Sequence, residues 1–196
     1  MIKFKKTIII IASTILLMIL LLFLNNNYKW IDSKNATILM QEELDHIRSM
    51  DISKLPEESK NFSAVITFYD HLIERSISAE VRIYHPKIPM NRVIVSIFLG
   101  DPILNYINTP NPLVSNIIPV KNASGIEKEN YNLRPNGEVK GITVSSNMHY
   151  FETATFNDVL EATPYVIVKV SWLDENSNEK VEYVKYTRDK YIIIRR

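Results

Sequence analysis

The chain opens with a continuous apolar run and then changes to shorter patterns in which apolar and polar residues alternate. Residues 7–24 contain no charged side chain, and their only polar members are Thr7, Ser13 and Thr14. A helix of this length rises about 27 Å, close to the thickness of the hydrocarbon core of a bilayer. Backbone polar groups in lipid must pair within their own segment, so the run predicts a transmembrane helix at residues 7–24.

Three lysines before this run predict its orientation. Lys3, Lys5 and Lys6 flank the N-terminal end, and the cytoplasmic flanks of membrane spans are enriched in Lys and Arg. We therefore expect residues 1–6 to form a cytoplasmic tail of a single-pass protein of the cell membrane, with the C-terminal domain extracytoplasmic. A cleaved signal peptide is the alternative, but its shorter apolar region ends at a small-x-small site, and none follows Leu24.

A helical pattern follows the apolar run. Ala36, Met40, Leu44 and Ile47 recur at spacings of three and four residues and make one apolar stripe between residues 32 and 50. We expect residues 25–61 to be a juxtamembrane stalk helix followed by a linker around Pro56. The helix either packs on the domain that follows or pairs with a membrane partner.

From residue 62 onward the apolar period is two, which is typical of half-buried strands. The expected strands lie at residues 62–69, 77–84, 92–99, 165–173, 181–186 and 191–194, with weaker candidates at 113–120, 138–145 and 149–156. Prolines interrupt the middle of the domain, and residues 105–112 are the expected long loop. The pattern predicts a mainly β protein in which residues 62–196 form an extracytoplasmic antiparallel β-sandwich.

One stretch supports a more specific fold. The sequence Leu-Glu-Ala-Thr-Pro-Tyr-Val-Ile-Val at residues 160–168 resembles the turn that enters a late strand of immunoglobulin-like and fibronectin type III domains. In those domains a tyrosine near the strand start hydrogen-bonds back to the turn, and the resemblance implies that Tyr165 has this role. The spacing from Leu160 to Tyr165 is one residue shorter than in the usual type III pattern, and no Cys…Trp…Cys set is present. The resemblance covers about fifteen residues and implies a fold class only.

Composition and charge narrow the location and the partners. The chain has a net charge of +1 and no cysteine, so it has neither disulfides nor the basic surplus of a nucleic-acid-binding domain. A domain of this size folds without disulfides, and the lack of cysteine in an exported chain favours a bacterial envelope protein. Abundant Ile, Asn and Lys fit an AT-rich bacterial genome. The expected partners are the lipid bilayer, through the N-terminal helix, and a protein of the envelope. We expect no nucleic acid.

Histidines and carboxylates are the first candidates for chemistry. His46, His71, His85 and His149 do not lie at metal-ligand spacing, and the alternative is that they are surface or edge residues. Acidic residues cluster near the end of the domain, at Glu152, Asp158 and Glu161. Acid–base catalysis would need one of them in an apolar pocket that raises its pKa, and the alternative is a set of solvated carboxylates.

Two short motifs and the tyrosines complete the candidates. Asp174, Asn176 and Asn178 match the start of a calcium loop, but its sixth position is Glu179 instead of Gly, and these residue types also favour hairpin turns. The S-x-x-K match at residues 177–180 lies in the same polar turn rather than at a helix start. Tyrosines recur on the expected strands and could form a carbohydrate-binding or protein-binding face. These are Tyr69, Tyr84, Tyr150, Tyr165, Tyr183 and Tyr186.

These observations assign no catalytic, cofactor-binding or metal-binding residue and no cofactor. The leading hypothesis is a membrane-anchored extracytoplasmic β-sandwich module, non-enzymatic, that binds a protein partner or takes part in envelope assembly. One alternative is an extracytoplasmic hydrolase that uses carboxylates. Another is a bitopic subunit of a secretion or conjugation machine, where we would expect an α+β domain rather than one so rich in strands.

Overall fold

The chain divides into two compact units, residues 1–41 and 42–196. The computed structural model describes residues 38–109, 111–116, 121–122, 125–126 and 131–196. Within those residues no helix has the length and apolar character that crossing a bilayer requires. Residues 7–24 lie outside the described residues, so the transmembrane helix stays a prediction.

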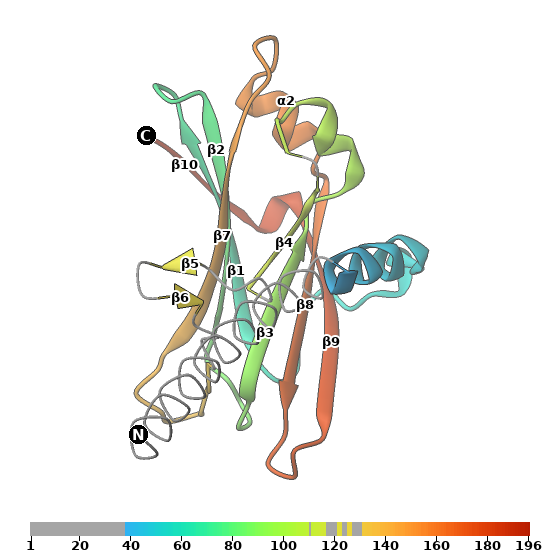
Figure 1. The fold of residues 1–196 in the computed structure, drawn as a ribbon, viewed down its shortest axis with the longest axis vertical. Helices are drawn as coiled ribbons and strands as arrows, with labels where there is room; N and C mark the ends of the chain where they lie inside the picture. The colour runs from blue at the N-terminus through green and yellow to red at the C-terminus, as the bar shows by residue number, and fades with distance from the viewer. Residues whose placement is uncertain (1–37, 110, 117–120, 123–124, 127–130) are drawn as a thin grey trace, which may run out of the picture. The chain divides into compact units, whose positions relative to one another are not determined.

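Two four-stranded sheets make up the second unit, and each has its own strand order (Figure 1). The first sheet has the order β10-β1-β2-β7, with β10 at Tyr191–Arg195, β1 at Ser63–His71, β2 at Ser76–Tyr84 and β7 at Gly141–His149. The second has the order β4-β3-β8-β9, with β4 at Leu113–Ser115, β3 at Asn91–Phe98, β8 at Tyr165–Leu173 and β9 at Glu179–Thr187. The mainly β sandwich that the sequence predicts is confirmed.

Alternating side chains place the core between the two sheets. On β2, Ile77, Ala79, Val81 and Ile83 are buried, and each lies two residues from the next. Because successive side chains of a strand point to opposite faces, these four line the inner face of the first sheet. Val166, Val168, Val170 and Trp172 do the same on β8 in the second sheet. The strands that alternate most clearly in the sequence therefore build the centre of the core.

The last strand differs from the antiparallel arrangement that we expected. β10 pairs with β1 in parallel, and Ile66 lies opposite Tyr191 in this pairing. A short 3₁₀-helix, η3 at Arg188–Lys190, connects β9 to β10 and carries the chain from the second sheet to the first. β9 and β10 both run upward in Figure 1, so the chain changes sheets without reversing its direction. Parallel pairing with β1 follows from that crossing.

The weaker strand predictions need correction. β4 ends at Ser115, and the two strands expected at 138–145 and 149–156 are one strand, β7.

The residues after β7 form a loop and then a helix, α2 at Phe156–Glu161. Thr155 and Asp158 form a capping box at its start, in which each side chain bonds the other's backbone N–H. Two further short strands, β5 at Lys121–Asn122 and β6 at Gly125–Ile126, pair with each other in antiparallel orientation. A 3₁₀-helix, η2 at Asp101–Asn105, lies between β3 and β4.

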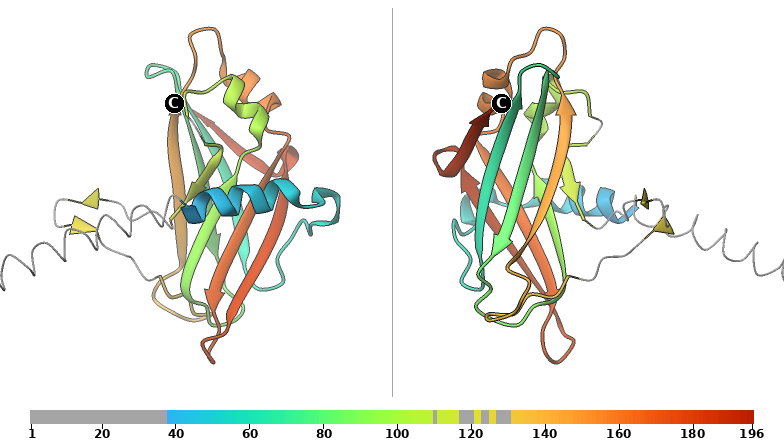
Figure 2. Two further views of the ribbon diagram at one scale, coloured as in Figure 1. Left: turned by 45° about the vertical axis from the view of Figure 1, so that its right-hand side comes forward. Right: turned by 90° about the vertical axis from the view of Figure 1, so that its left-hand side faces the viewer.

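The predicted helix is present over its described part, residues 38–49. Its residues 42–49 belong to the second unit and lie across the outer face of the second sheet (Figure 2). Leu44 and Ile47 are buried there, as their place in the apolar stripe predicts. Glu43 forms an ion pair with Lys169 on β8, and Arg48 donates from Nε to Asp101 at 3.0 Å. One outer face of the sandwich is therefore covered by a helix.

The segment after this helix also packs on the second sheet. A 3₁₀-helix, η1 at Ile52–Lys54, begins it. The backbone carbonyl of Pro56 accepts a hydrogen bond from the Lys185 N–H of β9 at 2.8 Å. Ser59 donates its hydroxyl to Glu182 on the same strand at 2.6 Å. The residues that we expected to be a linker therefore run along the edge strand β9.

The hydrogen bond expected from Tyr165 is made by a different tyrosine. Tyr165 does start β8, but its hydroxyl bonds to no described residue. The Tyr191 hydroxyl instead lies within hydrogen-bond distance of two carbonyl oxygens, that of Thr163, which follows α2, at 3.3 Å and that of Tyr186 on β9 at 3.4 Å. Tyr191 starts β10 and is partly buried, and its ring centre lies 5.0 Å from that of Phe68 on β1. The prediction that Tyr165 makes this bond was therefore wrong.

Replacing Tyr191 by phenylalanine should lower the free energy of unfolding by about 0.5–1.5 kcal/mol, the usual net contribution of one hydrogen bond. The matched change Tyr165→Phe should alter it by no more than about 0.5 kcal/mol, because that hydroxyl has no bond to lose within the described residues. Urea denaturation of the two variants measures the difference. Equal effects would contradict the assignment of the bond to Tyr191.

Candidate interaction surface

The three carboxylates of the hydrolase alternative lie on α2 and on the loop before it. Asp158 is occupied by the helix cap, since it accepts hydrogen bonds from the Thr155 N–H at 2.8 Å and the Thr155 hydroxyl at 2.6 Å. These bonds lower the pKa of Asp158, whereas a general acid needs a raised one. Glu152 and Glu161 are exposed. The arrangement is that of a capped helix with solvated neighbours.

The motif that resembles a calcium loop is a hairpin turn between β8 and β9. Asp174 Oδ1 accepts hydrogen bonds from the N–H groups of Asn176 and Asn178, both at 2.9 Å. Asp174 Oδ2 lies 3.5 Å from Lys180 Nζ. The turn's own donors thus occupy this carboxylate, and Ser177 adopts a φ of 63° within the turn. Among the described residues, no group of three or more His, Asp or Glu could hold a metal ion.

The four histidines lie in different places, and two of them share a row of the first sheet. His46 is on the helix and its ring lies 5.6 Å from that of Tyr183. His85 follows β2. His71 and His149 are each paired with Ser76, from β1 and from β7. The Ser76 hydroxyl is buried without a hydrogen-bond partner among the described residues, so it is not accessible to a substrate.

The tyrosines do not gather on one face. Tyr69 lies on the outer face of the first sheet, with the Arg196 guanidinium 4.6 Å from its ring centre. Tyr183 lies beneath the helix, where it donates to Glu43 at 3.2 Å, and burial raises its pKa above the usual value. Tyr186 belongs to the core, where burial raises its pKa to about 12. A single aromatic binding face is therefore not present in the described part of the chain.

A buried carboxylate closes the end of the first sheet. Asp70, on β1, is only 2% exposed, and Tyr150 after β7 donates its hydroxyl to it at 3.0 Å. Burial, followed by the hydrogen bond to Asp70, raises the pKa of Tyr150 above its usual value. The pair joins the ends of two strands that are not neighbours in the sheet. It positions the β1–β2 hairpin against the loop that follows β7.

Exposed apolar side chains occur at this same end and farther along the neighbouring edge strand β10, where Ile192 and Ile193 lie opposite Thr67 and Phe68. Five of the nine exposed large hydrophobic residues in the described chain lie on the β1–β2 turn, the loop after β7 and the strand β10; they are Leu72, Ile73, Phe151, Ile192 and Ile193. We call these five residues the apolar patch. Ile73 is 97% exposed, whereas the remaining members are between 42% and 63% exposed. Exposed apolar residues that cluster in this way mark interaction sites more often than scattered ones do.

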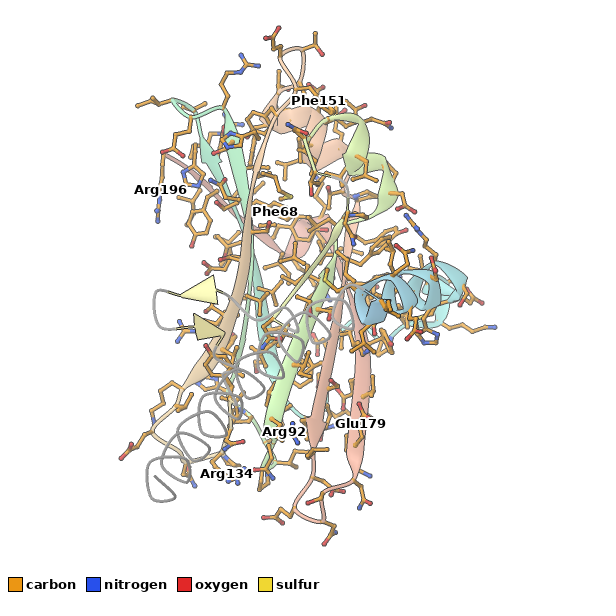
Figure 3. All side chains as sticks on the ribbon, in the orientation of Figure 1. Phe68, Arg92, Arg134, Phe151, Glu179 and Arg196 are labelled. Atoms are coloured by element: carbon orange, nitrogen blue, oxygen red, sulfur yellow. The ribbon has the colours of Figure 1, made fainter. Side chains whose placement is uncertain are left out.

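Hydrogen bonds hold the three segments of the apolar patch together. The Leu72 N–H donates to the carbonyl oxygen of Arg196 at 3.3 Å, which ties the β1–β2 turn to the end of β10. Arg75, in the same turn, donates its guanidinium to the carbonyl oxygen of Glu152 at 2.7 Å. Figure 3 shows Phe151 and Arg196 at one end of the sandwich, with Arg92 and Glu179 at the other.

Basic side chains border the apolar patch. Arg195 donates to Asn157 of α2 at 3.2 Å and lies 5.7 Å from the Phe156 ring centre. Arg75 and Arg196 are also exposed.

Two acidic residues, Glu74 and Glu152, are exposed in the same segments, so three arginines stand against two glutamates around the apolar patch. A patch of exposed apolar residues with a small surplus of positive charge around it can bind an apolar surface that carries acidic groups.

The sequence matches no known family and no curated protein. Among solved structures, that of murine CRIg matches with 7% identity, covering 69% of this chain and 96% of the CRIg chain, at a TM-score of 0.28. A TM-score of this size does not establish a common fold. The strand orders of the two sheets define the sandwich.

Proposed function

We propose that this chain is a single-pass membrane protein whose extracytoplasmic β-sandwich binds a protein partner of the bacterial envelope through the apolar patch. The observation that carries the proposal is the concentration of exposed apolar residues on three adjacent segments. Ile73 and Leu72 stand at the tip of a hairpin, where burial in the domain's own core is not possible. Burying each such side chain against a partner would contribute roughly 1.5–3 kcal/mol.

We further propose that the sandwich is of the immunoglobulin and fibronectin type III kind. In strand order, β1, β2 and β7 correspond to strands A, B and E of that fold, and β3, β8 and β9 correspond to C, F and G. β4 then takes the place of a short C′ strand beside β3. Domains of this architecture are common on cell surfaces, which supports a binding role, while β10 is an addition to the pattern.

The membrane anchor rests on the sequence. The apolar run at residues 7–24 and the lysines before it support a single span with the sandwich outside the cytoplasm. The helix at residues 42–49 is fixed to the sandwich by buried Leu44 and Ile47 and by the Glu43–Lys169 ion pair. This packing supports the first of the two interpretations of the helix, in which it packs on its own domain.

Substituting aspartate for Leu72 and Ile73 in the full-length protein should reduce recovery of the partner about tenfold or more, since two desolvated apolar contacts are replaced by charges. The measurement is copurification from membranes after mild detergent extraction. Val181→Asp is the matched control, because Val181 is 44% exposed on β9, away from the apolar patch. Unchanged recovery with the double variant, or an equal loss with the control, would contradict the proposed site.

A further inference from the structure

The four edges of the two sheets differ in what covers them. On β9, the Lys185 N–H is bonded to the Pro56 carbonyl at 2.8 Å, and charged side chains recur along the strand. β4 is three residues long. At the end of β7, the His149 carbonyl accepts from the Asn108 N–H at 2.8 Å. No described residue pairs with the outer edge of β10.

The hydrogen-bond register shows which groups of β10 face outward. The Arg196 N–H donates to the Asp70 carbonyl at 2.9 Å, and the Arg196 carbonyl accepts from the Leu72 N–H at 3.3 Å. In a parallel ladder, every second residue of a strand bonds a given neighbouring strand. The N–H and C=O groups of Ile194 and Ile192, two and four positions before Arg196, therefore also face β1. Ile193 and Arg195 therefore direct their N–H and C=O groups away from the sheet.

The side chains of β10 give it little of the protection that edge strands usually have. Its five residues are Tyr-Ile-Ile-Ile-Arg, with a single charge, Arg195, at the end and no proline. Ile192 is 47% exposed and Ile193 is 44% exposed. Natural sheets usually protect their edges with lysine, proline, bulges or a covering segment. The edge strand β9 has both charged side chains and a covering segment. One domain therefore contains a protected edge strand, β9, and a largely unprotected one, β10.

We propose that β10 binds an extended segment of the protein partner by strand addition, and that this segment is apolar at alternate positions and carries acidic residues. The inference rests on the proposed function and specifies the partner. Main-chain hydrogen bonds to Ile193 and Arg195 would supply affinity, while side chains of the added strand would lie beside the isoleucines. Residues 188–196 contain Arg188, Lys190, Arg195 and Arg196 against the single acidic Asp189. Lys190 is already paired with Glu57 at 3.1 Å, and the three remaining arginines favour an acidic segment.

A proline at position 193 should block the pairing of an added strand with β10 and leave the sandwich folded. Ile193→Pro removes an N–H that points away from β1, and proline is tolerated on an edge strand in that position. Ile193→Val is the matched control, because it keeps both the N–H and a β-branched side chain. The melting temperature of each variant shows whether the sandwich remains folded.

The test uses the full-length protein in its native membranes, with the photoreactive amino acid benzoylphenylalanine in place of Ile192. Irradiation should link it to one protein segment, and mass spectrometry of the linked peptide should show alternating apolar residues and acidic ones. Adding Ile193→Pro should reduce the yield of the link about tenfold, whereas adding Ile193→Val should leave it unchanged. Independently, the amides of Ile193 and Arg195 in the unaltered protein should exchange hydrogen about tenfold more slowly in membranes than after purification.

Three results would overturn strand addition: a link to lipid or to β10 of a second copy, an unchanged yield with Ile193→Pro, and rapid exchange of both amides in membranes. The double variant with aspartate at positions 72 and 73 distinguishes failure of strand addition from failure of the proposed function. If that variant still loses the partner, the apolar patch binds by side chains alone. If it retains the partner as well, the proposed function fails.

Discussion

Replacing Ile15 and Leu16 by lysine should release the full-length protein from the membrane. Both residues lie at the middle of the apolar run at residues 7–24. A lysine at the centre of a membrane helix costs about 2.5–3.5 kcal/mol, and each lost Ile or Leu removes a further ~0.5 kcal/mol of favourable insertion, so the two changes together oppose insertion by about 6–8 kcal/mol. This is the largest effect that the account predicts.

Carbonate extraction of membranes measures this release. The unaltered protein should stay in the pellet, and the double-lysine variant should be found in the soluble fraction or fail to leave the cytoplasm. Ile15→Val with Leu16→Val is the matched control, since valine preserves the apolar character of the run. Retention of the double-lysine variant in the carbonate pellet would mean that residues 7–24 are not what attaches the protein to the membrane.

Phe68→Ala should lower the free energy of unfolding by about 3–5 kcal/mol and the melting temperature by roughly 10 °C. Phe68 lies on β1 with 0% of its surface exposed, and its ring centre is 5.0 Å from that of Tyr191 on β10. Truncation would leave a cavity on the inner face of the first sheet, beside Tyr191 of β10. β10 should therefore become less protected against hydrogen exchange than the strands of the second sheet.

The matched control deletes the same atoms from the surface. Phe151 is 42% exposed, so Phe151→Ala should change the free energy of unfolding by about 1 kcal/mol or less. Denaturant titrations of both variants give the comparison. If the two truncations have equal effects, the inner face of the first sheet is not the centre of the core.

The parts of the fold that the sequence predicts well are those where a local pattern determines the outcome. Alternation on β2 and β8 predicted both the strands and their inner faces, because period two places one set of side chains on each side of a sheet. The helix over residues 38–49 followed in the same way from its apolar stripe. The parallel pairing of β10 could not be predicted, since alternation does not encode strand direction.

The capping box at Thr155 and Asp158 was a usable signal for α2. It was missed because a helix of six residues has too few apolar positions to show a period. The short η3 crossing gave no comparable signal.

The apolar patch was missed for another reason. Ile192 and Ile193 have the side chains of an ordinary core strand, and their exposure arises from the edge position of β10. Leu72 and Ile73 did carry a local signal, because two adjacent large apolar residues fall between two predicted strands, where turns are usually polar. The proximity of Phe151 depends on contacts across the first sheet, which one sequence does not reveal.

The absence of cysteine from the chain permits one direct test of the whole account. Ile73→Cys and Val181→Cys each introduce a single thiol, one in the apolar patch and one on β9, and both parent side chains are exposed. Intact cells are treated with a maleimide that cannot cross the cytoplasmic membrane, and the labelling rates are compared with those of the purified proteins. On cells, Val181→Cys should react readily, whereas Ile73→Cys should be shielded by the partner and react at least about tenfold more slowly than after purification. Labelling of neither thiol before the cells are broken, or equal rates for both on intact cells, would contradict this prediction.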